Sequence, residues 1–175
     1  MSRSYTTKLL TPIAGEMYEG LNDVFAYWDR LRGKRAMPSW PEFDWIALPP
    51  AVIPWCAVAD VLEDPLDFVC RFWGTSRTAL QGHDYTGWSI SEVSPKTVAD
   101  KIASEYRKIY EDRKPVYFET VYEEIGTPET FNYHFLRLPF RPDDTHVAQI
   151  LAVGLFEEKE IRKAHDFFDG MNPKG

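Results

Sequence analysis

The stretch 67–75, together with the turn 82–87 that follows it, limits what this chain can fold into more than any other part. The residues Asp-Phe-Val-Cys-Arg-Phe-Trp predict a strand, and Gly74 ends it. A short helix is predicted directly after this glycine, followed by the polar turn Gly-His-Asp-Tyr-Thr-Gly. Within the turn, Asp84 and Thr86 are expected to bond to the backbone through their side chains. Strand, helix and turn therefore follow one another at short range.

The wider pattern predicts two hairpins with helices between them. Residues 55–62 and 67–73 read as strands joined by Glu-Asp-Pro-Leu, which has hairpin-turn chemistry. Apolar residues at helical spacing predict a helix over 94–113, with Ser94 as its N-cap. Three further strands are predicted at 116–124, 130–138 and 146–156. This order favours an α+β fold, an antiparallel sheet covered by helices on one face.

Amphipathic helices flank this core on both sides. The first covers 16–32 and stops at Gly33, and the second covers 157–169. Between the first helix and the core lie five prolines, which forbid regular pairing and predict a connector that runs over the surface. The expected division is an N-terminal segment and helix (1–33), a proline-rich connector (34–54), the core (55–156) and a C-terminal helix and tail (157–175).

Composition excludes several classes of protein. The chain is 44% hydrophobic and 15% aromatic, which argues against extended disorder. Its net charge of −7 would repel phosphate backbones, so no nucleic-acid partner is expected. The apolar stretches are too short or too broken by proline to span a bilayer, so no membrane partner is expected either. Cys56 and Cys70 sit in apolar runs, which fits reduced, buried thiols and a cytoplasmic location.

Several short motifs together carry a resemblance to a known family. The first helix ends in Tyr27-Trp28 and Leu31-Arg32-Gly33, with Arg35 and Pro38 after it. The other marks are Asp67, Phe68, Arg71, Gly74 and Thr75; Gly82, Asp84, Thr86 and Gly87; and Pro115, Leu138, Pro139 and Gly154. In this order and spacing they resemble a family of small bacterial PAS proteins in which the sensor domain makes up nearly the whole chain. The resemblance covers roughly residues 20 to 156.

The resemblance implies a PAS-like five-stranded antiparallel sheet whose concave face, with the helices, can enclose a small molecule. Such cavities are mostly apolar with a few hydroxyl groups, so aromatic residues are the best pocket candidates. The candidates are Trp73, Tyr85, Trp88, Tyr106, Tyr110, Tyr117, Tyr133 and Phe135. The same rings would also serve to fill the core, so an open and a filled cavity are both alternatives. Arg71 is expected to pair with Asp67 or Asp84, or to face an anionic ligand.

Known cofactors of PAS sensors fit the sequence poorly. The run Cys70-Arg71-Phe72 is similar to the reactive segment of flavin-binding light sensors, but Val69 replaces its asparagine and the run lies in a predicted strand. Haem-binding PAS sensors usually take an axial histidine from the longer helix, and residues 94–113 contain none. The four histidines are not at metal-ligand spacing. Flavin, haem and metal are therefore not expected.

The expected function is a cytoplasmic sensory protein that binds a small apolar or aromatic ligand or a protein partner. It would signal in trans, because no kinase, cyclase or DNA-binding segment follows Phe156. The alternative is a ligand-free PAS interaction or dimerisation module. Catalysis is not expected, because no nucleophile turn or phosphate loop is present. The first helix packs either on the domain or on a twin copy, and its candidate residues for a homodimer interface are Met17, Leu21, Val24, Phe25 and Trp28.

Overall fold

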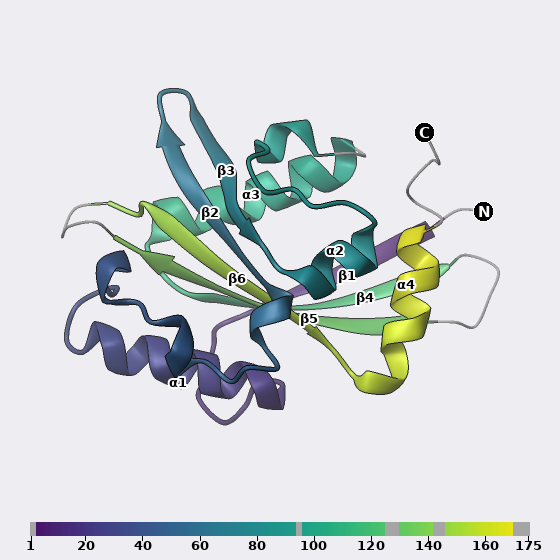
Figure 1. Cartoon of the computed structure of the whole chain (residues 1–175), viewed down its shortest axis with the longest axis horizontal. Coiled ribbons are helices and arrows are strands. Elements are labelled where there is room, and N and C mark those ends of the chain that lie inside the picture. Colours follow the sequence, from purple (N-terminus) through teal and green to yellow (C-terminus); the bar gives the residue numbers. More distant parts are fainter. Residues whose placement is uncertain (1–2, 94–95, 125–129, 142–145, 170–175) are drawn as a thin grey trace.

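A computed structural model of the chain describes residues 3–93, 96–124, 130–141 and 146–169. Its strands form one antiparallel sheet in the order β1-β4-β5-β6-β2-β3 (Figure 1). The strands are β1 (Arg3–Leu10), β2 (Cys56–Glu63), β3 (Leu66–Trp73), β4 (Val116–Glu124), β5 (Thr130–Phe140) and β6 (Gln149–Phe156). The α-helices are α1 (Glu19–Arg32), α2 (Thr75–Gln81), α3 (Lys96–Asp112) and α4 (Ile161–Asp169). Short 3-10 turns are η1 (Trp40–Glu42), η2 (Trp45–Ala47), η3 (Ile53–Trp55), η4 (Ile90–Glu92) and η5 (Glu158–Glu160).

The α+β architecture predicted from the sequence is confirmed, and most of the expected elements are present. β2 and β3 pair as a hairpin, and β4, β5 and β6 pair in chain order. The side-chain to backbone bond predicted for Asp84 in the turn after α2 is also confirmed, because the backbone N–H of Thr86 donates to Oδ1 of Asp84 at 2.8 Å. The predicted N-cap Ser94 lies outside the described residues.

The sheet has six strands, one more than expected. The additional strand, β1, pairs antiparallel with β4 along its whole length. Few of its side chains are apolar, so hydrophobic alternation did not reveal it. An edge strand is held largely by its backbone ladder, which any side chains allow, and here the hydroxyls of Thr7 and Thr120 also bond at 3.1 Å. Sequence analysis based on patterns of apolar residues does not detect polar strands of this kind.

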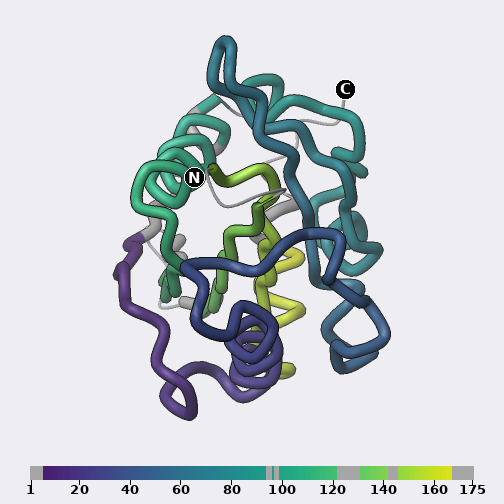
Figure 2. Tube along the Cα trace, turned by 90° about the vertical axis from the view of Figure 1, so that its left-hand side faces the viewer, coloured from purple at the N-terminus to yellow at the C-terminus, as the bar shows by residue number. Residues whose placement is uncertain are grey.

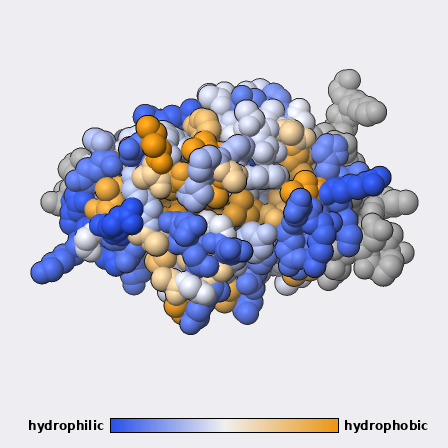
Figure 3. All heavy atoms as spheres, turned by 60° about the horizontal axis from the view of Figure 1, so that its bottom comes forward, coloured by the Kyte–Doolittle hydropathy of each residue, from blue (hydrophilic) through white to orange (hydrophobic). Residues whose placement is uncertain are grey.

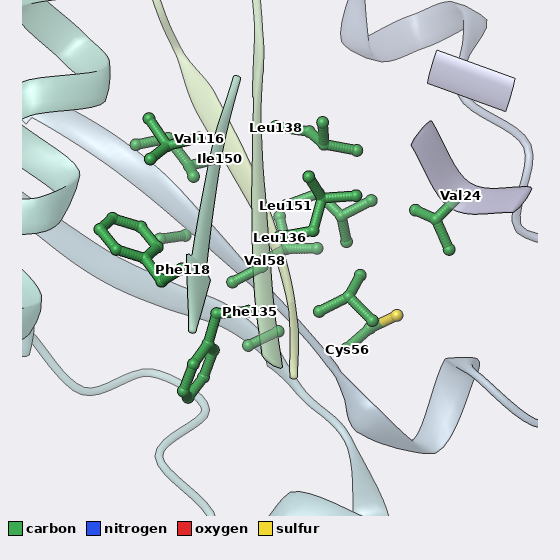
Figure 4. Packing of buried hydrophobic residues seen from close by; sticks show 14 of the residues in the cluster. Val24, Cys56, Val58, Val116, Phe118, Phe135, Leu136, Leu138, Ile150 and Leu151 are labelled. Atoms are coloured by element: carbon green, nitrogen blue, oxygen red, sulfur yellow. The ribbon is translucent and has the colours of Figure 1, made fainter. Parts of the chain in front are cut away.

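Helices cover both faces of the sheet. Helices α2 and α3 lie over one face, here called the inner face, and α1 lies over the other (Figures 1 and 2). Close to the sheet, Val116, Phe118 and Phe135 point to the side of α3, whereas Leu136 and Val24 lie on the side of α1 (Figure 4). The sequence predicted helices on one face of the sheet only. The structure differs, because α1 covers the second face.

The proline-rich connector packs on the sheet instead of running over the surface. Met37 and Leu48 are each 2% exposed, so both belong to the core. The ring of Trp40 meets Phe140 edge to face at 5.2 Å, and its backbone N–H donates to the carbonyl of Arg141 at 2.9 Å. Prolines prevent a regular strand here but do not prevent burial, because the connector also carries apolar side chains such as Met37 and Leu48. The connector runs from α1 to the start of β2 (Figure 2).

In the first helix, the residues that carry the family resemblance hold the helix against the rest of the domain. The indole N–H of Trp28 donates to the carbonyl of Pro139 at 2.9 Å, which ties α1 to β5. The hydroxyl of Tyr27 accepts from the backbone N–H of Asp44 at 2.8 Å, which ties α1 to the connector. Gly33 ends the helix with a φ of +58°, a backbone conformation that favours glycine. These motif residues explain the fold and not the function.

Candidate functional site

Small residues on the central strands leave room on the inner face for large side chains. Ala57 of β2 pairs with Ala152 of β6, and Gly154 of β6 pairs with Phe135 of β5. A Cβ atom on Gly154 would lie 2.6 Å from two ring carbons of Tyr133. The absence of that atom lets the Tyr133 ring lie across β6.

Polar aromatic residues fill this space together with phenylalanines. The rings of Tyr133 and Phe156 stack at 3.8 Å, and Tyr106 of α3 meets Phe68 of β3 edge to face at 5.2 Å. Trp73 is buried at the end of β3. Burial raises the pKa of both Tyr106 and Tyr133, so both hydroxyls are neutral at physiological pH. The inner face is thus packed, yet it carries more polar groups than an ordinary core.

A buried ion pair joins α3 to the centre of the sheet. Arg137 of β5 is 4% exposed and pairs with the carboxylate of Glu105, which also lies 3.7 Å from the ammonium group of Lys101. The Arg137 guanidinium sits 4.4 Å above the ring of Tyr106. Burial alone would lower the pKa of Arg137, but the charge and hydrogen bond of Glu105, together with Tyr106 and Tyr133, outweigh burial and raise this pKa. Arg137 is therefore charged, and the carboxylate of Glu105 neutralises its charge.

A second arginine is buried on the same face. Arg77 of α2 is 4% exposed, and its guanidinium carbon lies 4.4 Å from the ring centre of Trp73 and 6.0 Å from that of Phe135. Its hydrogen bond to the carbonyl of Trp55 is long, at 3.4 Å. In the part of the chain that the structure describes, no acidic side chain forms an ion pair with it. The two arginines thus differ in how their charge is balanced.

Three buried N–H groups of this cluster have no hydrogen-bond acceptor among the described residues. They are Nε of Arg77, Nε of Arg137 and the indole Nε1 of Trp73. A buried donor without an acceptor costs about 1–3 kcal/mol, and native proteins contain few of them. Both arginines lie near the Phe135 ring, and Arg77 also lies over the Trp73 ring, so the three donors mark the inner face as the best candidate for a binding site. We call Trp73, Arg77, Tyr106, Tyr133, Phe135 and Arg137 the inner cluster.

The structure brings together five of the nine pocket residues predicted from the sequence. Trp73, Tyr106, Tyr133 and Phe135 belong to the inner cluster, and Tyr85 packs on Trp73 at 5.2 Å.

Tyr110, Trp88 and Arg71 were predicted with them but lie at the edges or outside. The hydroxyl of Tyr110 donates to Glu63 at 2.9 Å, and the side chain of Trp88 is 41% exposed. Arg71 is also exposed and pairs with Asp60 at 2.8 Å, so the predicted partners Asp67 and Asp84 are wrong. Inward and outward positions alternate on β3, and Arg71 takes an outward one.

Tyr117 lies on the opposite face of the sheet from the inner cluster. Its hydroxyl is 2.9 Å from Nδ1 of His134, and the His134 ring stacks on Tyr18 at 4.8 Å. Burial lowers the pKa of His134, against the opposing effect of nearby carboxylates, and burial raises the pKa of Tyr117 to about 12. Both groups are neutral at physiological pH, which suits a packed contact under the start of α1.

The candidate dimer residues of α1 pack on their own domain, one of the two alternatives that the sequence left open. Met17, Leu21, Val24 and Trp28 are buried. Phe25 is only partly buried and stacks on Trp28 at 6.1 Å. A homodimer stays a prediction.

A groove of about 450 Å³ opens beside α1, where the chain passes from α3 to β4. Its lining comprises Phe25, Trp28, Asp29, Arg32, Ala36, Asp112, Arg113, Lys114 and Pro115. Asp29 is ion-paired with Arg32, and Asp112 with Lys108. Arg113 and Lys114 therefore leave the rim positive. Seen from the side of α1, the surface is otherwise mostly hydrophilic with scattered hydrophobic patches (Figure 3).

The cysteines are buried, as the sequence predicted. Cys70 lies in β3 and Cys56 begins β2, and burial raises the pKa of each thiol to about 12. Over residues 3–93, 96–124, 130–141 and 146–169, no group of three or more histidine, cysteine or acidic side chains could hold a metal ion. Within those same ranges, no helix has the length and apolar character needed to cross a membrane.

The sequence reasoning missed the two arginines of the inner cluster, although each left a signal in the sequence. Arg137 occupies the inner-facing register of β5 after Phe131, Tyr133 and Phe135, where a charge interrupts an apolar series. Arg77 lies three residues before the buried Leu80, on the same side of a short helix. In both cases a charged residue occupies a position that the strand or helix periodicity assigns to the core. A search for such positions would have identified Arg77 and Arg137.

Comparisons with known proteins place this geometry in a family. A family described as "PAS domain" matches residues 18–156. Among solved structures, an RNA-binding light-oxygen-voltage receptor shares 16% identity at a TM-score of 0.46, over 94% of this chain and 41% of that one. A fungal LOV domain photoreceptor shares 13% identity at a TM-score of 0.37, over 66% of this chain and 81% of that one. This chain thus spans less than half the length of the first of these. No curated protein sequence matches it.

Proposed function

The chain belongs to the PAS domain family, and we propose on this basis that it is a sensory domain that binds a small molecule at its inner cluster. Binding, and not catalysis, is its activity, and association with a protein partner carries the signal onward. The observation that carries the proposal is the set of unsatisfied N–H donors: those of Arg77 and Arg137, which both lie near the Phe135 ring, and that of Trp73, whose ring lies under Arg77. A core that served packing alone would gain stability by replacing such groups with apolar ones.

Helix α2 is well placed to report on an occupant. It begins directly after Trp73, which ends β3, and it places Arg77 over the Trp73 ring. The same helix packs against α4. A molecule bound at the inner cluster would therefore contact α2. A shift of α2 would in turn displace α4, which lies at the surface of the domain. This route links an interior site to a surface where a partner can bind.

Native mass spectrometry of the protein purified without added ligand tests the proposal. We expect a reproducible mass above that of the bare chain. Trp73→Phe removes the unsatisfied indole N–H and should lower the fraction that carries this mass. Trp88→Phe makes the same change at a tryptophan that is 41% exposed, and it should not lower that fraction. A bare mass in every preparation of the wild type, together with no binding of the small-molecule probes described below, would refute ligand binding.

The groove beside α1 favours a second function, a module that associates with another copy of itself. Phe25 and Pro115 give the groove an apolar lining, while Arg113 and Lys114 make its rim positive. Acidic side chains outnumber basic ones in the chain, 27 to 20, so a second copy can place carboxylates against this rim. Lys114→Glu should then convert dimers to monomers in light scattering after size exclusion, and Lys163→Glu on α4 is the control. A wild-type protein that is monomeric at every concentration would exclude this function.

A further inference from the structure

The two buried arginines of the inner cluster call for different explanations. Arg137 has its counter-charge within the protein, because the carboxylate of Glu105 pairs with it. Arg77 is just as buried, at 4% exposed, and no acidic side chain among the described residues forms an ion pair with it. A buried charge without a partner is among the most costly arrangements in a protein.

Four ionisable groups that interact with Arg77 do not supply the missing negative charge. They are Cys56, Cys70, Tyr106 and Tyr133. Burial raises the pKa of all four, and that of each thiol reaches about 12. All four groups are thus uncharged at physiological pH. The aromatic faces of Trp73 and Phe135 attract the guanidinium but carry no net charge.

The geometry also indicates the shape of what would balance this charge. The guanidinium carbons of Arg77 and Arg137 lie 6.0 and 5.6 Å from the ring centre of Phe135, so the two cations flank one apolar ring. Nε of Arg77 and Nε1 of Trp73 are buried donors without an acceptor among the described residues. A carboxylate has two oxygens that accept from such donors, and a planar apolar body can stack on aromatic rings such as those of Trp73 and Phe135.

We propose that the inner cluster binds a small organic carboxylate with a flat apolar body, and that the carboxylate pairs with Arg77. This inference rests on the proposed function and adds the chemical class of the ligand. In this arrangement Trp73 donates a second hydrogen bond, and Arg137, already paired with Glu105, shapes the site without neutralising the ligand. The ligand carboxylate thus neutralises the charge of Arg77, which no acidic side chain among the described residues pairs with.

Calorimetric titration with 2-naphthoate and 2-naphthamide tests the charge requirement directly. The two probes share their ring system, and only the acid is charged. We expect the wild type to bind the acid about tenfold more tightly or better, the size of one charge-assisted hydrogen bond. Arg77→Met should abolish this preference. Arg71→Met removes an exposed arginine that pairs with Asp60, and it should keep the preference.

A second readout remains informative if Arg77→Met does not fold. In ¹⁵N-labelled protein, the indole signal that is missing from Trp73→Phe identifies Nε1 of Trp73. This signal should move downfield when 2-naphthoate is added to the wild type. Equal affinity for the two probes, an unmoved indole signal, or binding of neither probe would overturn the carboxylate inference.

Mass spectrometry of any molecule that copurifies separates this failure from failure of the proposed function. A neutral molecule held at the inner cluster would leave the sensory function standing and refute the carboxylate. A bare protein that binds neither probe would refute both.

Discussion

Replacing Glu105 by Gln should destabilise the protein more than removing the arginine that Glu105 neutralises. Glu105→Gln keeps the size of the side chain but leaves Arg137 charged, with only 5% of its side chain exposed. Removing one partner of a buried ion pair costs about 3–5 kcal/mol, because the remaining charge has lost its compensation. With a urea m-value of about 2 kcal/mol/M for a chain of this size, the unfolding midpoint should fall by about 2 M.

The opposite substitution leaves a smaller defect. In Arg137→Met, Glu105 still has the ammonium group of Lys101 at 3.7 Å, and that lysine is 17% exposed at its side chain. The free energy of unfolding should fall by about 2 kcal/mol, less than for Glu105→Gln. The double variant should be more stable than Glu105→Gln alone, because it no longer buries an uncompensated charge.

Urea unfolding followed by circular dichroism measures all three variants under the same conditions. The reasoning is refuted if Glu105→Gln costs less than Arg137→Met, or if the double variant is less stable than Glu105→Gln. Either result would mean that water or another group compensates Arg137, and that burial at this position does not demand a counter-charge.

Three further predictions follow from packing and burial. Gly154→Ala should lower the free energy of unfolding by about 3 kcal/mol in urea titrations, because the new methyl group would overlap the Tyr133 ring, and an unchanged midpoint would contradict this packing. Burial holds the pKa of His134 below 6.5, so the unfolded state takes up the proton first as the pH falls. Stability should therefore decline as the pH drops through about 6.5, and His134→Gln should flatten this part of the curve, whereas an equal slope in the variant would exclude His134 as its source. Cys56 and Cys70 should react with a thiol reagent at about pH 8 only on unfolding, and rapid labelling of the native protein would show that they are accessible.

Local sequence patterns predicted much of the fold because the spacing of apolar residues follows directly from which side chains are buried. The alternation in β4 predicted its bounds, 116–124, and the glycine after Trp73 predicted where β3 ends. The spacing of apolar residues likewise predicted α1 and α3. Strand β1 was missed for the converse reason, since its pairing depends on the backbone and not on an apolar face.

The candidate site was predicted less well because its residues come from separate elements. Tyr106, Tyr133 and Trp73 belong to α3, β5 and β3, and the sequence indicated all three as aromatic residues. It also indicated Tyr117, which the register places on the opposite face, with His134. A residue type suggests what a side chain can do, but strand register decides which face it serves.

By itself, the sequence determined the class of fold and the order of most elements, because periodicity and turn chemistry act over a few residues at a time. The resemblance to the family came from its motifs and their order along the chain. Only the tertiary structure decided which charges meet. It paired Arg137 with Glu105 and Arg71 with Asp60, and it left Arg77 buried without an acidic partner among the described residues. The physical reason is that charge balance in the interior depends on distances between segments far apart in the chain, and these distances exist only after the sheet and helices have packed.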